Sequence, residues 1–246
     1  LGECGEQDGN DRNGERMKAR ALAFTCFKRW GKDLPVCDLV IMNRIQASTG
    51  DTQCPAIEQP VGLTPQCIEL LKQAADLGDS FAMTSLGTCS WNGFFMPQNK
   101  EISLRLFQQA ADFGDADAMF ILALCYKKGE CVAQDKAKAV DLCQQAAGLG
   151  HTEAMVDLGV CYLNGDGVSQ DEAKAIELFR QAADFCNTQA MANLASCNWK
   201  HDSVTLNKKK GLHLFQQAAA MGHAGSIASL AYFYDTGNVV HQDKVK

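Results

Sequence analysis

The tripeptide Gln-Ala-Ala recurs along this chain at a fixed interval of 36 residues, without drift. It begins at Gln73, Gln109, Gln145, Gln181 and Gln217. A second motif keeps the same interval, as in "LALCYKKG" and, one period later, "LGVCYLNG". Internal repetition at such a period is the signature of repeat architectures, in which stacked units share one core. The chain is therefore predicted to be built from about five 36-residue repeats.

Each repeat is predicted to be a helix-turn-helix unit. In the third copy, Ala154, Leu158 and Cys161 form an apolar stripe at helical spacing. The sequence "GDGV" (165–168) then ends the helix, because glycine accepts the positive φ of a tight turn. Helices are expected near 64–78, 80–93 and 99–113, and then at intervals of 36 residues.

Stacking of these units determines the predicted fold class. A single helix pair cannot bury its own apolar face, whereas stacked neighbours bury a continuous core. The predicted fold is all-α, an α/α superhelical solenoid over residues 64–246 whose last repeat is incomplete. Residues 1–63 are predicted to form an irregular N-terminal tail and helical cap. Because the sequence starts at Leu1 and stops inside a repeat, we expect a fragment of a longer chain.

The third copy also follows a known consensus. The consensus is A-x-x-x-L-G-x-x-Y-x-x-G-x-G-V-x-x-D-x-x-K-A, followed by A-A-x-x-G. The third copy matches it at every position except the final glycine, where it has Cys186. The matching residues are Ala154, Leu158, Gly159, Tyr162, Gly165, Gly167, Val168, Asp171, Lys174, Ala175, Ala182 and Ala183. This pattern resembles the Sel-one-like repeat (SLR) family, relatives of the tetratricopeptide repeats. The resemblance runs from about Pro65 to the C-terminus, although the fourth copy departs from it in "KHDSVTLNKKK", which lacks the glycine pair.

The resemblance implies two alternative functions. The first is a protein–protein interaction scaffold or adaptor that binds partners through its concave face, as an accessory subunit of a larger assembly. The second, implied by a secreted cysteine-rich branch of the family, is binding or hydrolysis of a small ligand of β-lactam or cell-wall type. The sequence contains no Gly-x-Ser-x-Gly, phosphate-binding glycine loop or His-Glu-x-x-His, so an enzyme is not expected.

Composition excludes several classes of partner and cofactor. The net charge of −6 argues against nucleic acid, because phosphate binding needs clustered positive charge. The sequence contains no apolar run of about 18 residues, so no membrane-spanning helix is predicted. The five histidines do not cluster with cysteines, so neither a metal nor another cofactor is expected. The lysines at 208–210 are interpreted as part of a solvated outer face.

The first helices provide the predicted partner surface. Opposite their core-facing side, the middle copies are apolar where a solvated helix would be polar. "GFFMPQ" adds two phenylalanines in a turn. The predicted partner-binding residues are Trp91, Phe94, Phe95, Phe120, Ile121, Leu124, Val156, Val160 and Trp199. Packing of the same residues against neighbouring first helices is the alternative.

The twelve cysteines fall into two groups. Those at one repeat position are expected to be small buried thiols, because equivalent positions lie on the order of 10 Å apart, beyond disulfide reach. They are Cys89, Cys125, Cys161 and Cys197. The possible disulfide cysteines are Cys26, Cys37, Cys54 and Cys67, whose pairing is open, together with Cys125 and Cys143. An organelle lumen or secretory compartment is favoured over the cytosol.

Overall fold

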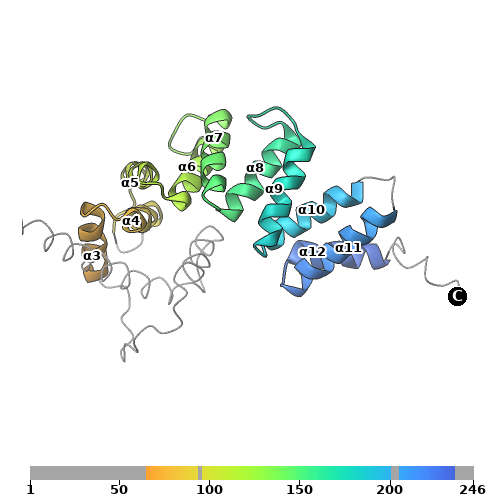
Figure 1. Ribbon diagram of the computed structural model, residues 1–246. Helices are drawn as coiled ribbons and strands as arrows, with labels where there is room; N and C mark the ends of the chain where they lie inside the picture. The colour runs from red at the N-terminus through yellow and green to blue at the C-terminus, as the bar shows by residue number, and fades with distance from the viewer. Residues whose placement is uncertain (1–64, 94–95, 201–204, 236–246) are drawn as a thin grey trace, which may run out of the picture. The chain divides into compact units, whose positions relative to one another are not determined.

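The computed structural model describes residues 65–93, 96–200 and 205–235, and every secondary-structure element in them is an α-helix (Figure 1). The helices are α3 (Pro65–Asp76), α4 (Ser80–Asn92), α5 (Lys100–Asp112), α6 (Ala116–Lys128), α7 (Lys136–Gly148), α8 (Thr152–Asn164), α9 (Glu172–Asp184), α10 (Thr188–Lys200), α11 (Thr205–Ala220) and α12 (Ala224–Asp235). The all-α helix-turn-helix fold predicted from the periodicity is confirmed. The tail and cap predicted over 1–63 lie outside the described residues.

The helices group into two compact units, each described by itself. Unit 1 lies within Leu1–Gln134 and contains α3 to α6, and unit 2 lies within Asp135–Lys246 and contains α7 to α12. Inside each unit, every helix packs against the next one along the chain. Each unit is therefore stabilised internally by contacts between helices that are consecutive in the sequence, as the repeat pattern predicts.

The core of each unit is built from small and large side chains at fixed repeat positions. Ala110, Ala146 and Ala182, from the Gln-Ala-Ala motif, have no exposed surface. The rings of Phe107 and Phe179 are equally inaccessible, at 1% and 0% exposed. Because alanine ends at a single methyl group, helices approach closely at these positions, and the phenylalanine rings fill the space that remains.

The first helix of each repeat begins at a side-chain cap. At this position a side-chain oxygen, or Nδ1 of a histidine, accepts a hydrogen bond from the backbone N–H three residues later, at 2.8–3.1 Å. The capping residues are Asp79, Asp115, His151, Asn187 and His223. The cap satisfies one of the backbone donors that a helix start leaves unpaired.

Two cysteines lie at turns in a left-handed backbone conformation that glycine usually takes. First helices such as α8 end at a left-handed residue, Gly165, whose N–H donates to the carbonyl of Cys161. Two non-glycine residues also take positive φ: Cys131 at 62° and Cys186 at 61°. Cys186 stands where the other repeats have glycine, as at Gly150, and Cys131 stands where the third copy has Gly167, so the glycine-like conformation persists at both cysteines.

Candidate functional site

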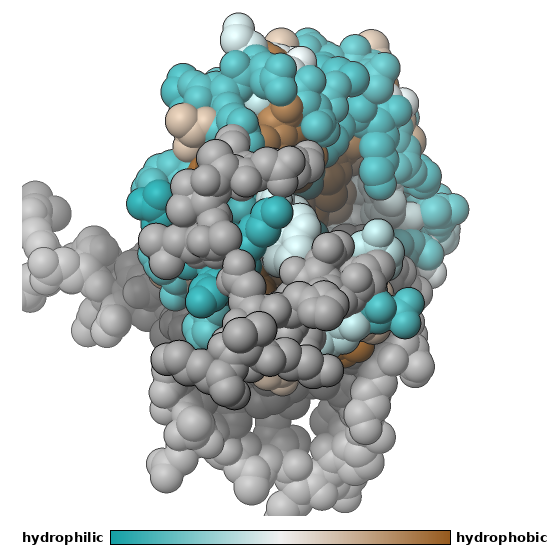
Figure 2. Space-filling model, turned by 90° about the vertical axis from the view of Figure 1, so that its right-hand side faces the viewer, coloured by the Kyte–Doolittle hydropathy of each residue, from teal (hydrophilic) through white to brown (hydrophobic). Residues whose placement is uncertain are grey.

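One large apolar side chain lies exposed just after the second helix of each repeat. In unit 1 these are Leu77 and Phe113, and in unit 2 they are Leu149, Phe185 and Met221. They are 41–64% exposed, with both phenylalanines at 64%. We call these five the helix-end residues. On the face drawn in Figure 2, apolar surface lies mainly in recesses between hydrophilic side chains. What sets the helix-end residues apart from other exposed apolar side chains, such as Ile102 and Ile227, is their recurrence at one position of every repeat.

Their exposure follows from how the second helices end. Phe113 is the C-cap residue of α5, with φ −83°, and its N–H still donates to the helix carbonyl of Gln109. The next residue, Gly114, takes φ +83° and turns the chain toward α6. The C-cap side chain therefore points away from the buried face that ends at Ala111, and water covers it.

In unit 1, Phe113 borders a groove of about 340 Å³ between α3, α4 and α5. Met83 and Leu86 of α4 line its base, and Gly78 lies beside the Phe113 ring. A Cβ at Gly78 would be 3.9 Å from Cζ of Phe113, so the glycine leaves one flank of the ring uncovered. The groove also has polar lining residues, among them Lys72 and Asp76, so together with the ring it forms a mixed apolar and polar recess that an extended or helical partner segment could contact.

The predicted partner residues of the middle repeats are less accessible than the helix-end residues. Phe120, Ile121 and Leu124 lie together on α6 of unit 1, and each is half-buried. On α8 of unit 2, Val156 is buried at 7% exposure and Val160 is half-buried. Part of the α6 surface therefore remains open to a partner, whereas Val156 belongs to the core of unit 2.

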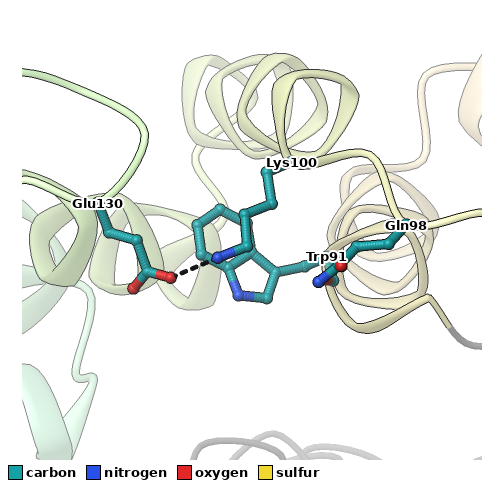
Figure 3. Close-up of polar contacts among 4 residues, drawn as sticks. All are labelled: Trp91, Gln98, Lys100 and Glu130. Carbon is teal, nitrogen blue, oxygen red and sulfur yellow. Dashed lines mark hydrogen bonds and ion pairs between the residues drawn. The ribbon is translucent and has the colours of Figure 1, made fainter.

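Trp91 contacts Lys100 and Gln98 in unit 1, and Glu130 pairs with Lys100 (Figure 3). The ammonium of Lys100 lies 4.7 Å from the centroid of the Trp91 ring and forms a 2.7 Å ion pair with Glu130. The side-chain amide of Gln98 donates to the Trp91 carbonyl at 2.8 Å. Hydrogen bonding to Glu130 raises the pKa of Lys100, so this cation stays charged over the ring. One face of the indole is thus occupied from within the chain.

Trp199, the predicted partner residue of the fourth repeat, packs inward. Its ring stacks on Phe233 with centroids 4.0 Å apart, and it lies against a buried cluster that includes Ala195 and Phe215. Trp199 therefore stabilises α10 against α12. Phe94 and Phe95 lie outside the described residues.

The structure describes the side chains of seven cysteines. Cys89, Cys125, Cys161 and Cys197 are buried, as the repeat position predicts. Burial raises the pKa of Cys125 to about 11, so at neutral pH it is a protonated free thiol. Cys143 is also buried, on α7, while Cys131 and Cys186 are exposed free thiols. Of the remaining disulfide candidates, Cys26, Cys37 and Cys54 lie outside the described residues, and Cys67 lies on α3.

Two further kinds of site can be checked over the described residues. No group of three or more potential metal ligands comes together among them. None of the described helices combines the length and apolar character that crossing a bilayer requires.

The helix-end residues were not identified from sequence, although their signal is present there. Leucine, phenylalanine or methionine directly precedes the glycine or cysteine that ends each second helix, at intervals of 36 residues. A helical wheel does not reveal their exposure, because they lie after the last helical turn.

The comparisons with known proteins agree with this architecture. The family model described as Sel1 repeat matches residues 64–79, 80–115, 116–151, 152–184 and 188–223. A search of the curated proteins found no match.

Among solved structures, a protective antigen of uropathogenic Escherichia coli strains that displays an SLR fold shares 32% identity, with a TM-score of 0.65. The match covers 69% of this chain and 36% of that protein, so this chain spans about a third of its length. A Sel1 repeat protein from Oxalobacter formigenes, 24% identical, matches 75% of this chain and 76% of its own with a TM-score of 0.69, which shows the shared fold. The family match extends over more than half of the residues, and the chain belongs to the Sel1 repeat family, whose members generally act as protein-interaction scaffolds.

Proposed function

We propose that this chain is a scaffold that binds protein partners through its helix-end residues. The observation that carries the proposal is the recurrence of one exposed apolar side chain per repeat, with Phe113 and Phe185 each 64% exposed. Burying a side chain of this size stabilises a complex by roughly 1.5–3 kcal/mol. Because such a side chain recurs every 36 residues along the sequence, each unit offers more than one of them, which suits a protein partner that makes several apolar contacts.

The α6 surface is proposed as a second contact region. Phe120, Ile121 and Leu124 are half-buried, so each retains apolar surface that a partner could cover. A role as accessory subunit of a larger assembly is proposed on the same basis, together with the general role of the family. The half-buried Trp91 on α4 and Val160 on α8 are included in this proposal as further contacts.

The scaffold proposal can be tested by partner capture with the full chain as bait. Chemical cross-linking in an extract of cells that naturally make the protein, followed by mass spectrometry, identifies what the wild type contacts. The double variant Phe113→Ser with Phe185→Ser should reduce recovery of those proteins by about tenfold or more, equivalent to ~1.4 kcal/mol of binding energy. Helix content and Tm should change little, because both side chains are largely in water.

A matched control removes an exposed aliphatic side chain elsewhere. Ile227 on α12 is 51% exposed, and Ile227→Ser should leave partner recovery unchanged. If Phe120→Ser with Leu124→Ser abolishes capture while the helix-end variant does not, the contact surface is α6. If neither double variant alters capture, the proposal that these apolar residues bind partners is wrong.

A further inference from the structure

Unit 2 contains a groove with an apolar floor and a basic rim. The groove has a volume of about 600 Å³ and lies between α9, α10 and α11. The half-buried side chains of Ile176, Leu194 and Leu214 supply its apolar surface. Its cationic and titratable lining residues are Arg180, Lys209, Lys210 and His213. No acidic residue is among the described residues that line it.

The surrounding sequence reinforces this positive charge. From Thr188 to Tyr234 the chain has four lysines and one aspartate, whereas the whole chain has 23 basic and 29 acidic residues. On α9, Glu177 pairs with Arg180 at 3.2 Å. Both partners are more than half exposed, so this ion pair contributes little and leaves the guanidinium able to turn toward a ligand.

The groove of unit 1 is the repeat equivalent of this one, with a different charge. Three positions correspond, three repeats apart: Lys72 with Arg180, Leu86 with Leu194, and Leu106 with Leu214.

The positions of Lys209 and His213 are filled in unit 1 by Glu101 and Arg105, which pair with each other at 2.7 Å. Asp76 also lines the unit 1 groove. The shared fold therefore supplies the groove and its leucines, while the substitutions on α11 supply the unbalanced positive charge.

We propose that the unit 2 groove binds an acidic peptide segment that carries aliphatic or aromatic side chains among its carboxylates. The apolar side chains would cover Leu194 and Leu214, and the carboxylates would contact Lys209 and Lys210. The inference rests on the proposed scaffold function, because it takes the partner to be a protein, and it adds the chemical class of one bound segment.

Two other anionic partners fit the groove less well. Single-stranded nucleic acid is generally held by aromatic stacking platforms beside a basic track, and the described lining of this groove has no phenylalanine, tyrosine or tryptophan. A lipid surface favours a protruding apolar face, whereas these leucines lie in a recess.

The test uses the full chain and short fluorescent peptides of defined composition, with binding followed by fluorescence anisotropy. A peptide in which glutamate and leucine alternate should bind, and the affinity should fall with added salt. A lysine–leucine peptide and a glutamate–serine peptide of the same length should each bind at least about tenfold more weakly. Equal binding of the glutamate–leucine and lysine–leucine peptides would overturn the inference.

Charge reversal locates the site. Lys209→Glu with Lys210→Glu should weaken binding of the glutamate–leucine peptide by about tenfold or more. Lys128→Glu with Lys138→Glu changes the net charge equally at exposed positions that do not line the groove, and should alter the affinity by less than about twofold. Similar losses in both double variants would reduce the effect to net charge and contradict a specific site. If the reversal variant fails to fold by circular dichroism, Lys209→Ala with Lys210→Ala replaces it, and unchanged affinity in that variant overturns the inference.

Methyl NMR of the wild type provides the spatial check. The signals of Ile176, Leu194 and Leu214 should shift on peptide addition, and shifts confined to unit 1 would overturn the assignment. Tighter binding of a single-stranded oligonucleotide or of anionic phospholipid vesicles, with displacement of the peptide, would also overturn it. If no peptide binds while partner capture through Phe113 and Phe185 persists, this inference fails and the scaffold proposal stands.

Discussion

Gly159 in α8 lies directly against the ring of Phe179 in α9. A Cβ at Gly159 would be 2.6 Å from Cε1 of Phe179, closer than nonbonded carbon atoms approach each other. Gly87 of α4 has the same relationship with Phe107 of α5, at 2.7 Å. In both repeats a glycine within the first helix makes room for a buried phenylalanine of the second.

Replacing this glycine should destabilise unit 2 even though alanine favours helices. Gly159→Ala gains up to about 1 kcal/mol in helix propensity. It must also displace the buried ring, and overpacking of this kind costs about 1–3 kcal/mol. We therefore expect a net loss of ~1–2 kcal/mol in the free energy of unfolding, measured by chemical denaturation.

Gly148, at the end of α7, is the matched control. It is exposed, and a Cβ there would meet nothing within 4 Å. Gly148→Ala should therefore stabilise by up to about 1 kcal/mol. If Gly159→Ala is as stabilising as this control, the contact with Phe179 is not tight in solution.

The sequence predicted the helices closely because five copies report the same pattern. The predicted spans 80–93 and 99–113 correspond to Ser80–Asn92 and Lys100–Asp112. The glycines that end these helices recur at the repeat period, so the turn signal at one copy is supported by the others. Local periodicity suffices here, because packing in this fold is mainly between neighbouring helices.

The candidate site could be predicted only in part. A helical wheel gives the direction of a side chain from its own axis, but not what neighbouring segments place over it. Trp91 is covered by Lys100, which comes from the next helix. The Trp199 ring stacks on Phe233, which lies 34 positions further along the sequence. Exposure at Phe113 depends on how α5 ends, and the wheel does not include that position.

The two cysteines with positive φ should be replaceable by glycine with a gain in stability. The left-handed conformation costs a non-glycine residue about 1–2 kcal/mol. Part of the gain is lost because glycine has more freedom in the unfolded chain. Cys131→Gly and Cys186→Gly should each raise the free energy of unfolding by up to about 1 kcal/mol in chemical denaturation.

The converse substitution isolates the backbone effect. Gly150 takes φ +84°, and a Cβ there would meet nothing within 4 Å. Gly150→Ala should therefore lose about 1 kcal/mol from conformation alone. A neutral Gly150→Ala together with neutral cysteine variants would show that these turns adjust without strain.

The helix cap Asp115 should make stability depend on pH in an unusual direction. Burial raises the pKa of Asp115 above 3.8, against the opposing hydrogen bond from the Ala118 N–H. The folded carboxyl thus holds its proton more tightly than the unfolded one. Its ionisation therefore lowers stability as pH rises from about 3.8 through the raised folded pKa. Asp115→Asn keeps an acceptor oxygen without the charge, so its stability relative to wild type should improve above this window.

Asp171, the cap of α9, is the opposite case. The Lys174 N–H donates to it and lowers its pKa, so the stability that it contributes is present above pH 3.8 and is lost as pH falls through the lowered folded pKa. The free energy of unfolding of Asp171→Asn should therefore fall furthest below that of the wild type at neutral pH. Denaturant melts of both variants between acid and neutral pH test the pair, and the same sign for both would contradict the burial of Asp115.

Thiol labelling should divide the cysteines by repeat position. Cys131 and Cys186 are exposed and should react with an alkylating reagent in the native chain. Cys89, Cys125, Cys161 and Cys197 are buried and should react only after unfolding. Mass spectrometry of peptides from native and unfolded samples distinguishes the groups. Rapid native labelling of Cys89, Cys161 or Cys197, or a disulfide at any of them, would show that this position is not part of the core.

The proposed lumenal or secretory compartment predicts disulfides elsewhere in the chain. Disulfides persist in oxidising compartments and are rare in the cytosol. Peptide mapping without reduction, on protein alkylated at harvest from its native source, should find bonds among Cys26, Cys37, Cys54 and Cys67. The same map tests the pair Cys125 and Cys143, whose first member is a free thiol in the structure. Recovery of all twelve cysteines in the alkylated form would contradict the compartment proposal, because an oxidising lumen would not leave every thiol of this chain reduced.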